Sequence, residues 1–306
     1  MKNNIMYYYN INIENIYQNN NYYYFDINNE RYEFVIYTRD IKEQEAIYKL
    51  NKKITESNLL VHEIIPNKDG YIVTIINNIP YILYKIYINK EKEISLLELT
   101  HLSYYNFEYD EILKRDNWYE LWAKKIDYLE YQINQTGKKY PILVDSFSYF
   151  VGLAENAISY AKNTTIESQK EITDIGVISH RKITDYKKIE LIYNPLNIVI
   201  DHKSRDLAEY IKISFFINNK NIYQELNSYF SKNYFSEYGI RLLFARILYP
   251  SFYFDLYEEI IINKRKESDI LNISNQIIEY ELYLKNIFYY LKNIYNIPEI
   301  EWLTKN

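Results

Sequence analysis

The sequence changes its hydrophobic rhythm near residue 95, and this change limits the folds that the chain can adopt. Before that point, short β-branched and aromatic segments are separated by turn residues, a pattern that is typical of antiparallel strands. After it, apolar residues mostly recur at the spacing of amphipathic helices. The pattern therefore predicts an α+β protein in two parts, a small antiparallel sheet followed by a larger, mostly helical part.

One helix interrupts the strands of the first part. Between Lys42 and Ile54, the apolar residues Ala46, Ile47 and Leu50 lie at helical spacing. Strands are expected on both sides of this helix, at Tyr22–Ile27, Tyr32–Thr38, Val61–Ile65, Tyr71–Ile76 and Tyr81–Tyr87. Turns are expected between them at Asn28-Asn29-Glu30, Asn67–Gly70 and Asn77-Asn78. The predicted order is strand, strand, helix and then three strands.

The second part is expected to be helical apart from one β-rich segment at 176–201. Its helices are expected from Trp118 onward, at 147–163 and over most of 206–292. We place the sheet part at residues 1–93 and the helical part at residues 94–306. The connection between the two parts is expected near Tyr87–Leu96.

Composition and charge exclude several classes of protein. The 306 residues carry a formal net charge of −5 with a pI of about 5.6, which argues against a nucleic-acid-binding protein with a basic surface. The chain has no cysteine, which excludes disulfides and thiolate metal sites. No apolar run approaches the roughly 18 residues that a membrane helix needs, and the N-terminus shows no signal-peptide pattern. We therefore expect a cytoplasmic protein without a membrane partner.

The β-rich segment and the residues after it hold the strongest candidate site. A short apolar run, Ile198–Ile200, ends in Asp201, and Asp206 opens an amphipathic segment five residues later. His180 precedes Asp201 by about twenty residues. A carboxylate at the end of a buried strand can bind a metal ion, or it can cap the turn that follows. The spacing alone leaves both roles open.

Four segments carry a resemblance to a known family. They are FVGLAENAIS (150–159), VISHRKI (177–183), PLNIVIDHKSRDLAEYIK (195–212) and RLLFARILYPSFYFDLYEEII (241–261). Together with the order of elements, they resemble the spore-coat-associated branch of the aminoglycoside phosphotransferase and choline kinase-like superfamily. The resemblance implies a two-lobed protein-kinase-like fold, with one helix inserted in the small sheet lobe. A shared fold does not by itself imply phosphotransfer.

The phosphate-binding parts of that family are altered in this chain. The family tends to use glycine or small polar residues between the first two strands, whereas here Glu30 would place negative charge beside phosphates. The resemblance also implies a strand lysine that contacts the phosphates and pairs with a helix glutamate. Arg39 is the cation nearest that position, and a guanidinium reaches differently from an ammonium. Glu45 is the expected partner of Arg39 and Glu43 the second candidate, unless both are simply exposed helix charges.

The expected catalytic loop lacks the family's catalytic residues. That loop reads roughly H-G-D-x-x-x-x-N in the family, and His180 matches its structural histidine. Lys182 stands at the position of the general-base aspartate, and Lys187 at that of the magnesium-binding asparagine. An ammonium group is a poor proton acceptor unless it is strongly desolvated. Asp185 lies in the same loop and can replace the base only if the backbone shifts by three residues.

Two aspartates do match positions that the family uses. Asp201 matches the main magnesium ligand, and we favour that role over a turn cap. Asp206 matches an aspartate that holds the catalytic loop by hydrogen bonds, and Arg205 is expected in the same buried polar network. The candidate contacts to a cofactor are therefore Arg39, Glu45 and Asp201. The candidate structural residues are His180, Arg205 and Asp206.

Two functional hypotheses follow. The first is a catalytically degenerate kinase-like protein, a pseudokinase, that serves as a binding or scaffold module and needs no cofactor. Its partner is expected to be a protein, and the resemblance points to sporulation and to components of the spore coat. The alternative is an active ATP-dependent small-molecule kinase that uses Asp201 for magnesium and Asp185 or a more distant acid as the base. We prefer the first hypothesis, because the glycine loop, strand lysine, general base and metal-binding asparagine are all substituted.

Overall fold

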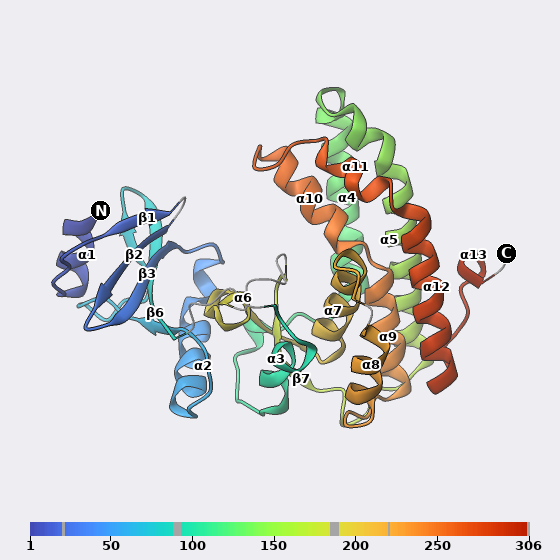
Figure 1. Cartoon of the computed structure of the whole chain (residues 1–306), viewed down its shortest axis with the longest axis horizontal. Helices are drawn as coiled ribbons and strands as arrows, with labels where there is room; N and C mark the ends of the chain where they lie inside the picture. The colour runs from blue at the N-terminus through green and yellow to red at the C-terminus, as the bar shows by residue number, and fades with distance from the viewer. Residues whose placement is uncertain (20–21, 88–92, 184–189, 220, 305–306) are drawn as a thin grey trace. The chain divides into compact units, whose positions relative to one another are not determined.

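The computed structural model describes residues 1–19, 22–87, 93–183, 190–219 and 221–304 (Figure 1). The chain forms two compact units. Unit 1 contains Met1–Lys114 and Val177–Asp201, and unit 2 contains Arg115–Gly176 and His202–Asn306. Each unit is therefore assembled from two separate stretches of the sequence.

Unit 1 is built on an antiparallel sheet of six strands. They are β1 (Tyr17–Asn19), β2 (Tyr22–Ile27), β3 (Glu30–Ile36), β4 (Glu63–Ile65), β5 (Thr74–Ile76) and β6 (Ile79–Ile86). The order across the sheet is β1-β2-β3-β6-β4, and β5 also pairs with β6. All five predicted strands are present in this sheet, whereas β1 was not predicted.

Paired asparagines form the tight hairpins of the sheet. β2 and β3 pair up to the residues that flank Asn28 and Asn29, whose φ angles are 52° and 65°. Asn77 and Asn78 join β5 to β6 in the same way, with φ angles of 52° and 64°. Asn adopts positive φ more readily than most residues, and such two-residue turns match the twist of antiparallel strands. Both predicted turns are confirmed.

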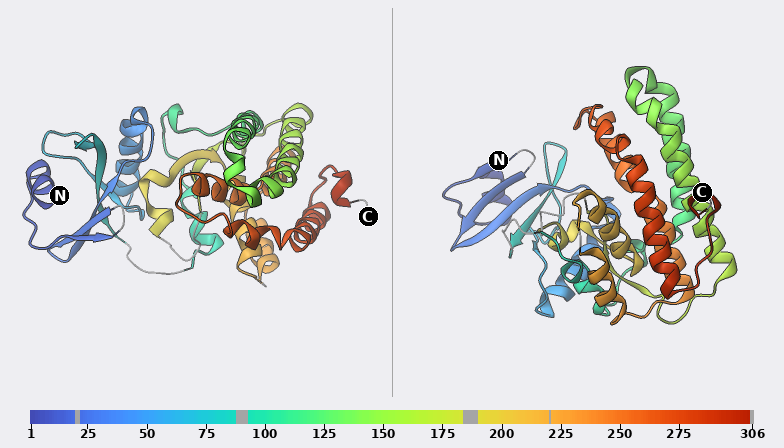
Figure 2. Two further views of the ribbon diagram at one scale, coloured as in Figure 1. Left: turned by 90° about the horizontal axis from the view of Figure 1, so that it is seen from above. Right: turned by 45° about the vertical axis from the view of Figure 1, so that its right-hand side comes forward.

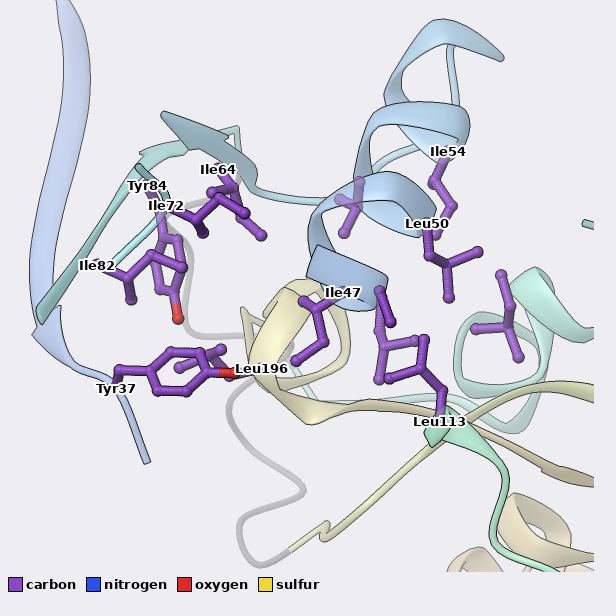
Figure 3. Packing of buried hydrophobic residues seen from close by; sticks show 14 of the residues in the cluster. Tyr37, Ile47, Leu50, Ile54, Ile64, Ile72, Ile82, Tyr84, Leu113 and Leu196 are labelled. Atoms are coloured by element: carbon purple, nitrogen blue, oxygen red, sulfur yellow. The ribbon is translucent and has the colours of Figure 1, made fainter. Parts of the chain in front are cut away.

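Helices cover the two faces of the sheet. They are α1 (Lys2–Tyr9) and α2 (Gln44–Glu56). Leu83 of β6 packs in a cluster with Ile5 of α1, whereas its neighbour Tyr84 packs with Ile47 of α2 (Figure 3). This division follows from the alternation of side chains along a strand. α1 was not predicted from the sequence, because its Asn- and Tyr-rich segment has weak helix propensity, and burial against the sheet stabilises it.

A second, two-stranded sheet lies in unit 1 apart from its end residues Gly176 and His202, which belong to unit 2. It is formed by β7 (Gly176–His180) and β8 (Ile198–His202). The remaining elements of unit 1 are η1 (Ile41–Glu43), α3 (Leu96–Leu99), η2 (His101–Tyr104), η3 (Glu111–Leu113), α6 (Glu190–Tyr193) and η5 (Pro195–Asn197). Leu113, Leu196 and Ile200 from these elements pack in the same cluster as Ile47 and Leu50 of α2 (Figure 3).

The boundary between the compact units differs from the expected one at residue 93. Residues 94–114 and 177–201 belong with the sheet, because their apolar side chains complete the core on the α2 face. Part of the expected connection at Tyr87–Leu96, residues 88–92, lies outside the described residues. The β-rich segment predicted at 176–201 is confirmed as β7 and β8.

Unit 2 is a helical assembly around one buried helix. Its helices are α4 (Trp118–Thr136), α5 (Pro141–Glu167), α7 (Ser204–Phe216), α8 (Ile222–Phe230), α9 (Glu237–Leu248), α10 (Ser251–Ile261), α11 (Asp269–Ser274), α12 (Ile277–Ile294) and α13 (Glu301–Thr304), with the short η4 (Gly137–Lys139) after α4. Every residue of α9 from Tyr238 to Leu248 is buried, and α5 and α7 pack directly on it. α5 and α12 lie alongside each other, and Tyr149 of α5 donates a hydrogen bond to Glu281 of α12 at 2.8 Å (Figure 2).

The helices predicted for the second part of the chain are therefore present. Within the described ranges, no helix combines the length and the apolar character that crossing a membrane requires.

Candidate functional site

Arg39 lies just after β3, at the end of the strand where the sequence predicts a phosphate-binding cation. Its side chain is completely buried. The guanidinium Nε donates to Glu43 Oε2 at 2.6 Å. Nη1 donates to the main-chain carbonyls of Leu196, at 3.4 Å, and of Ile198. Arg39 thus connects three segments of unit 1, namely the end of β3, the start of α2 and the start of β8.

Glu43, and not Glu45, is the partner of Arg39. The side chain of Glu43 is 9% exposed, whereas Glu45 is exposed to solvent. The expected pairing with Glu45 is therefore wrong. The physical reason is the way the helix begins. Asp40 accepts a hydrogen bond from the Lys42 amide and starts η1, which turns Glu43 toward the core before α2 begins.

One end of the Arg39 guanidinium has no hydrogen-bond partner among the residues that the structure describes. Nη2 is buried, and it forms no hydrogen bond within the described part of the chain. The hydroxyl of Tyr84 on β6 is likewise buried without a hydrogen-bond partner there. Burial raises the pKa of Tyr84 well above its usual range, and the nearby Arg39 opposes that shift. Each unpaired buried donor costs roughly 1–3 kcal/mol, so these two groups are costly features of unit 1.

The negative charge at the turn between β2 and β3 is offset by a neighbouring lysine. Glu30 is paired with Lys85 of β6 at 2.5 Å, and the Tyr32 hydroxyl donates to Glu30 at 3.1 Å. The pair with Lys85 is the main cause that holds the pKa of Glu30 below its usual value. Because the pair is solvent-exposed, its contribution to stability is small.

His180 and Asn197 shape the start of the expected catalytic loop. His180 ends β7, is 2% exposed, and donates from Nε2 to the Ile192 carbonyl at 3.0 Å. The Asn197 side chain accepts from the Lys182 amide at 3.0 Å and donates to the Lys182 and Leu191 carbonyls at 2.9 and 3.0 Å. Asn197 therefore closes the loop at both of its ends. Asn197 was not predicted as a functional residue, although an Asn directly before a buried strand is a common turn signal.

Of the loop residues at expected catalytic positions, the structure describes Lys182. The backbone of Lys182 is fixed by Asn197, and its side chain is half-buried. Asp185 and Lys187 lie outside the described residues. A role of Asp185 as a substitute base therefore stays a prediction.

Asp201 lies near the end of β8, a strand whose residues are all buried, and it is 2% exposed. The described residues contain no group of three His, Cys, Asp or Glu side chains arranged to hold a metal ion. Asp201 would thus need oxygen ligands from a bound nucleotide and from water to hold magnesium, which prefers six oxygen ligands. Its role as a metal ligand stays a prediction.

A polar cluster in unit 2 fixes the backbone immediately after Asp201. His202 Nε2 donates to Asp174 Oδ1 at 3.0 Å, and His202 Nδ1 accepts from the Ser204 amide at 3.1 Å. The Ser204 hydroxyl lies 2.7 Å from Nδ1. The arrangement has the order of a Ser-His-Asp triad, but Ser204 is completely buried, which excludes attack on a substrate. The cluster therefore caps α7 and does not form a nucleophilic site.

Gly239 in α9 makes this cluster possible. A Cβ atom at this position would lie 3.0 Å from both Asp174 Oδ1 and His202 Cε1. The Ser236 hydroxyl accepts from the Gly239 amide at 2.8 Å and donates to Asp174 at 2.7 Å. Close approach of His202 thus explains a glycine inside a helix, where it is otherwise unfavourable.

Arg205 and Asp206 lie in the first turn of α7 and are 9% and 2% exposed. One turn further, Glu209 forms a buried charge cluster. Its oxygens accept from Lys212 at 3.0 Å, from Arg246 at 3.0 Å and from the Ser251 hydroxyl at 3.1 Å. Burial alone would raise the pKa of Glu209, but the cations, Arg205 among them, lower it to about 2. The predicted bonds of Asp206 to the catalytic loop stay a prediction.

Comparisons with known proteins agree with this fold. A family model described as "Spore coat putative kinase YutH" matches residues 2–287. The "Endospore coat-associated protein YutH" of Bacillus subtilis (strain 168) is 30% identical over 209 residues, and the match spans 61% of this chain and 61% of that relative.

Solved structures show the same architecture. An aminoglycoside phosphotransferase from Alicyclobacillus acidocaldarius subsp. acidocaldarius DSM 446 has a TM-score of 0.65 at 10% identity, with 96% of this chain and 97% of that chain covered. Spectinomycin phosphotransferase APH(9)-Ia, in complex with ADP and spectinomycin, has a TM-score of 0.55 at 13% identity, with 94% and 93% covered. These likenesses confirm the predicted kinase-like α+β fold, and the match over residues 2–287 shows that the chain belongs to the spore coat putative kinase YutH family.

Proposed function

We propose that this protein is a catalytically degenerate member of the kinase-like fold that acts as a binding or scaffold component associated with the spore coat. The observation that carries the proposal is the environment of Arg39. The cation that stands where the family places its phosphate-binding lysine is buried and bonded to Glu43 and to two main-chain carbonyls. Two of its three nitrogens are thus committed to holding unit 1 together.

The residue types of the catalytic loop support the same proposal. Lys182 replaces the general base, and an ammonium group does not accept a proton at neutral pH unless burial lowers its pKa strongly. Lys187 replaces the second magnesium ligand with a cation. Phosphoryl transfer depends on positioning and electrostatics. The combined loss of the general base, the second metal ligand and the cation that binds the phosphates is therefore expected to reduce turnover by many orders of magnitude.

Association with the spore coat is supported by the family description and by the name of the 30% identical relative. A coat-associated scaffold would bind another coat protein, and it would need no cofactor. The proposal predicts that the tagged protein remains with purified spores and is released by treatments that extract the coat. Recovery only from the mother-cell cytosol would contradict it.

An active small-molecule kinase is the second candidate, and two observations favour it. Asp201, which the sequence resemblance matches to the family's magnesium ligand, lies near the end of a buried strand, and Arg39 Nη2 has no hydrogen-bond partner among the described residues. An oxygen of a nucleotide phosphate would satisfy that nitrogen. In this reading Asp201 and the phosphates together would hold magnesium, which would neutralise charge on the phosphates.

Turnover separates the two functions. ADP release from ATP and magnesium is to be measured in the presence of aminoglycosides and small amino alcohols, for the wild type and for Asp185→Ala, Asp201→Ala and Asp69→Ala. Asp69 is an exposed turn residue and serves as the matched control. The proposal predicts background rates for all four proteins. Turnover that is abolished by Asp201→Ala and Asp185→Ala but kept in Asp69→Ala would establish the kinase instead.

A further inference from the structure

A small cavity opens beside α2 in unit 1. Its volume is about 220 Å³. Ala46, Lys49, Leu50 and Lys53 line it from α2. These four residues are spaced by three and four positions, so they form one stripe along the helix. The cavity is thus an extension of the helix face that carries the core of unit 1.

The α2 side of the cavity has an apolar floor and a cationic rim. Ala46 and Leu50 are 5% and 2% exposed and belong to the core cluster (Figure 3 labels Leu50). Lys49 is exposed and has no ion-pair partner in the part of the chain that the structure describes. Lys53 donates to the main-chain carbonyl of Glu108 at 3.1 Å and to its carboxylate at 2.8 Å. One ammonium group, that of Lys49, is therefore available to a ligand.

The other side of the cavity carries opposite charge. It is formed by Glu108, Tyr109 and Asp110, which precede η3. Asp110 caps η3, because its Oδ1 accepts from the Ile112 amide at 3.1 Å. The ring of Tyr109 is half-buried and packs against the core cluster. This side thus offers the second oxygen of the Asp110 carboxylate, together with an aromatic surface.

We infer that this cavity binds a small zwitterion, with a free amino acid as the ligand class. Its carboxylate would pair with Lys49, its ammonium group with Asp110, and its hydrocarbon part would cover Leu50 and the Tyr109 ring. A simple anion would be repelled by Glu108 and Asp110, and a simple cation by the two lysines. A volume of about 220 Å³ holds a molecule of amino-acid size but is below the usual range of sites for larger cofactors.

A ligand in the cavity would affect the hydrogen bonds of Arg39, because α2 connects the two. Glu43 is the residue directly before α2 and precedes Ala46 by three positions, so it continues the same stripe at the start of the helix. Glu43 holds Arg39, and Arg39 holds the carbonyls of Leu196 and Ile198. A ligand that steadies α2 would thus slow opening of the start of β8. This inference does not rest on the proposed function, because it concerns a different surface of unit 1.

The test is thermal unfolding of the full chain with each of the twenty amino acids at millimolar concentration. Matched ligands that lack one charge, namely the amino-acid amides and the N-acetyl derivatives, serve as ligand controls. The inference predicts that at least one amino acid raises Tm by about 5 °C at saturation, and that its amide and its N-acetyl derivative do not. If no amino acid raises Tm, or if the single-charge analogues act equally well, the inference is wrong.

Variants locate the site. Lys49→Ala and Asp110→Asn are expected to weaken binding about tenfold or more, because each removes a charged hydrogen-bond partner. Asn keeps the oxygen that caps η3, so Asp110→Asn is expected to fold normally. Lys52→Ala is the matched control on the same helix, since Lys52 pairs with Glu56 at 3.8 Å and does not line the cavity. Equal weakening by Lys52→Ala would overturn the assignment to this cavity.

Hydrogen exchange tests the connection to β8. The ligand is expected to slow exchange of the Ile198 and Val199 amides in the wild type. Glu43→Gln should bind the same ligand but lose that slowing, because the neutral amide of the variant would no longer hold Arg39 by charge. Unchanged exchange in the wild type with ligand bound would contradict the coupling.

Discussion

Each unit contains a buried charge cluster, and the two clusters are satisfied to different degrees. In unit 2, the oxygens of Glu209 accept from Lys212, Arg246 and Ser251. In unit 1, Arg39 is held by Glu43 and by main-chain carbonyls, but Nη2 is buried without a hydrogen-bond partner among the described residues. A saturated cluster is expected where a network serves stability alone. An unsatisfied one is expected where a functional position has been adapted to a structural task.

The largest effect is expected in the saturated cluster. Glu209→Gln would remove the carboxylate that the buried Lys212 and Arg246 share, and it should lower the free energy of unfolding by about 3–5 kcal/mol. Urea denaturation monitored by circular dichroism measures this loss. Glu56→Gln, which disrupts only the exposed pair with Lys52, should cost less than about 1 kcal/mol. Equal losses in the two variants would show that burial of the Glu209 cluster is unimportant.

A smaller but more local effect is expected at Arg39. Arg39→Met would remove the guanidinium that pairs with the buried Glu43, and should cost about 3 kcal/mol, because a single carboxylate can relieve its burial by taking up a proton. The substitution should also speed hydrogen exchange at the start of β8, because Arg39 binds main-chain carbonyls there. Arg31→Met is the control, since its pair with Asp26 is largely exposed. Unchanged exchange at Ile198 would show that Arg39 does not hold the start of β8.

Two glycines in the helices of unit 2 should respond in opposite directions. Gly239→Ala would bring a Cβ within 3.0 Å of Asp174 and His202, and should destabilise the protein by about 2 kcal/mol. Gly152→Ala in α5 meets no atom within 4 Å, and should stabilise it by about 0.5–1 kcal/mol through helix propensity. Thermal unfolding of both variants measures the difference. Stabilisation by Gly239→Ala would show that the His202 cluster does not require close packing.

Effects of less than about 2 kcal/mol are expected from single tyrosines at high pH. Burial raises the pKa of Tyr9 in unit 1 and of Tyr257 in unit 2 to about 12. A raised folded-state pKa stabilises the protein fully below pH 10, and this stability is lost as pH rises from 10 through 12. At pH 11, each tyrosine is expected to lose about 1.4 kcal/mol relative to pH 8. Phe at either position should remove that part of the loss.

The same two tyrosines differ at neutral pH. The Tyr9 hydroxyl lies 3.1 Å from Thr74 Oγ1, so Tyr9→Phe should cost about 1 kcal/mol at pH 7. The Tyr257 hydroxyl is buried without a hydrogen-bond partner in the described ranges, so Tyr257→Phe should be neutral or stabilising. Chemical denaturation at pH 7 and pH 11 measures both differences. A loss at pH 7 for Tyr257→Phe as large as that for Tyr9→Phe would contradict this account.

Much of the fold could be predicted from local patterns. Alternating apolar residues and the asparagine pairs at 28–29 and 77–78 identify the hairpins, because both signals act over a few residues. α1 could not be predicted, because only its packing against the sheet stabilises it. The division into two compact units also differs from the expected boundary, since β7 and β8 pack with the α2 core through contacts that are distant in sequence.

The candidate site was predictable in its residue types and less so in its geometry. Sequence spacing identifies Arg39 and a helix glutamate, but it cannot show that η1 turns Glu43 toward Arg39 and leaves Glu45 outside. It also cannot show that His202 reaches Asp174, which lies 28 residues earlier. Such contacts depend on tertiary packing, and no local sequence motif predicts them.

The most direct test of the account is calorimetric titration of the wild type and of Asp201→Ala with ATP and magnesium. A degenerate kinase-like protein is expected to show no magnesium-dependent binding in either form at millimolar nucleotide. The reason is that Arg39, the expected phosphate-binding cation, is bonded within the protein, and Lys187 replaces the second metal ligand. Saturable, magnesium-dependent binding to the wild type that disappears in Asp201→Ala would contradict it. In that case a bound nucleotide would have to be accommodated beside Asp201, and the kinase hypothesis would be favoured.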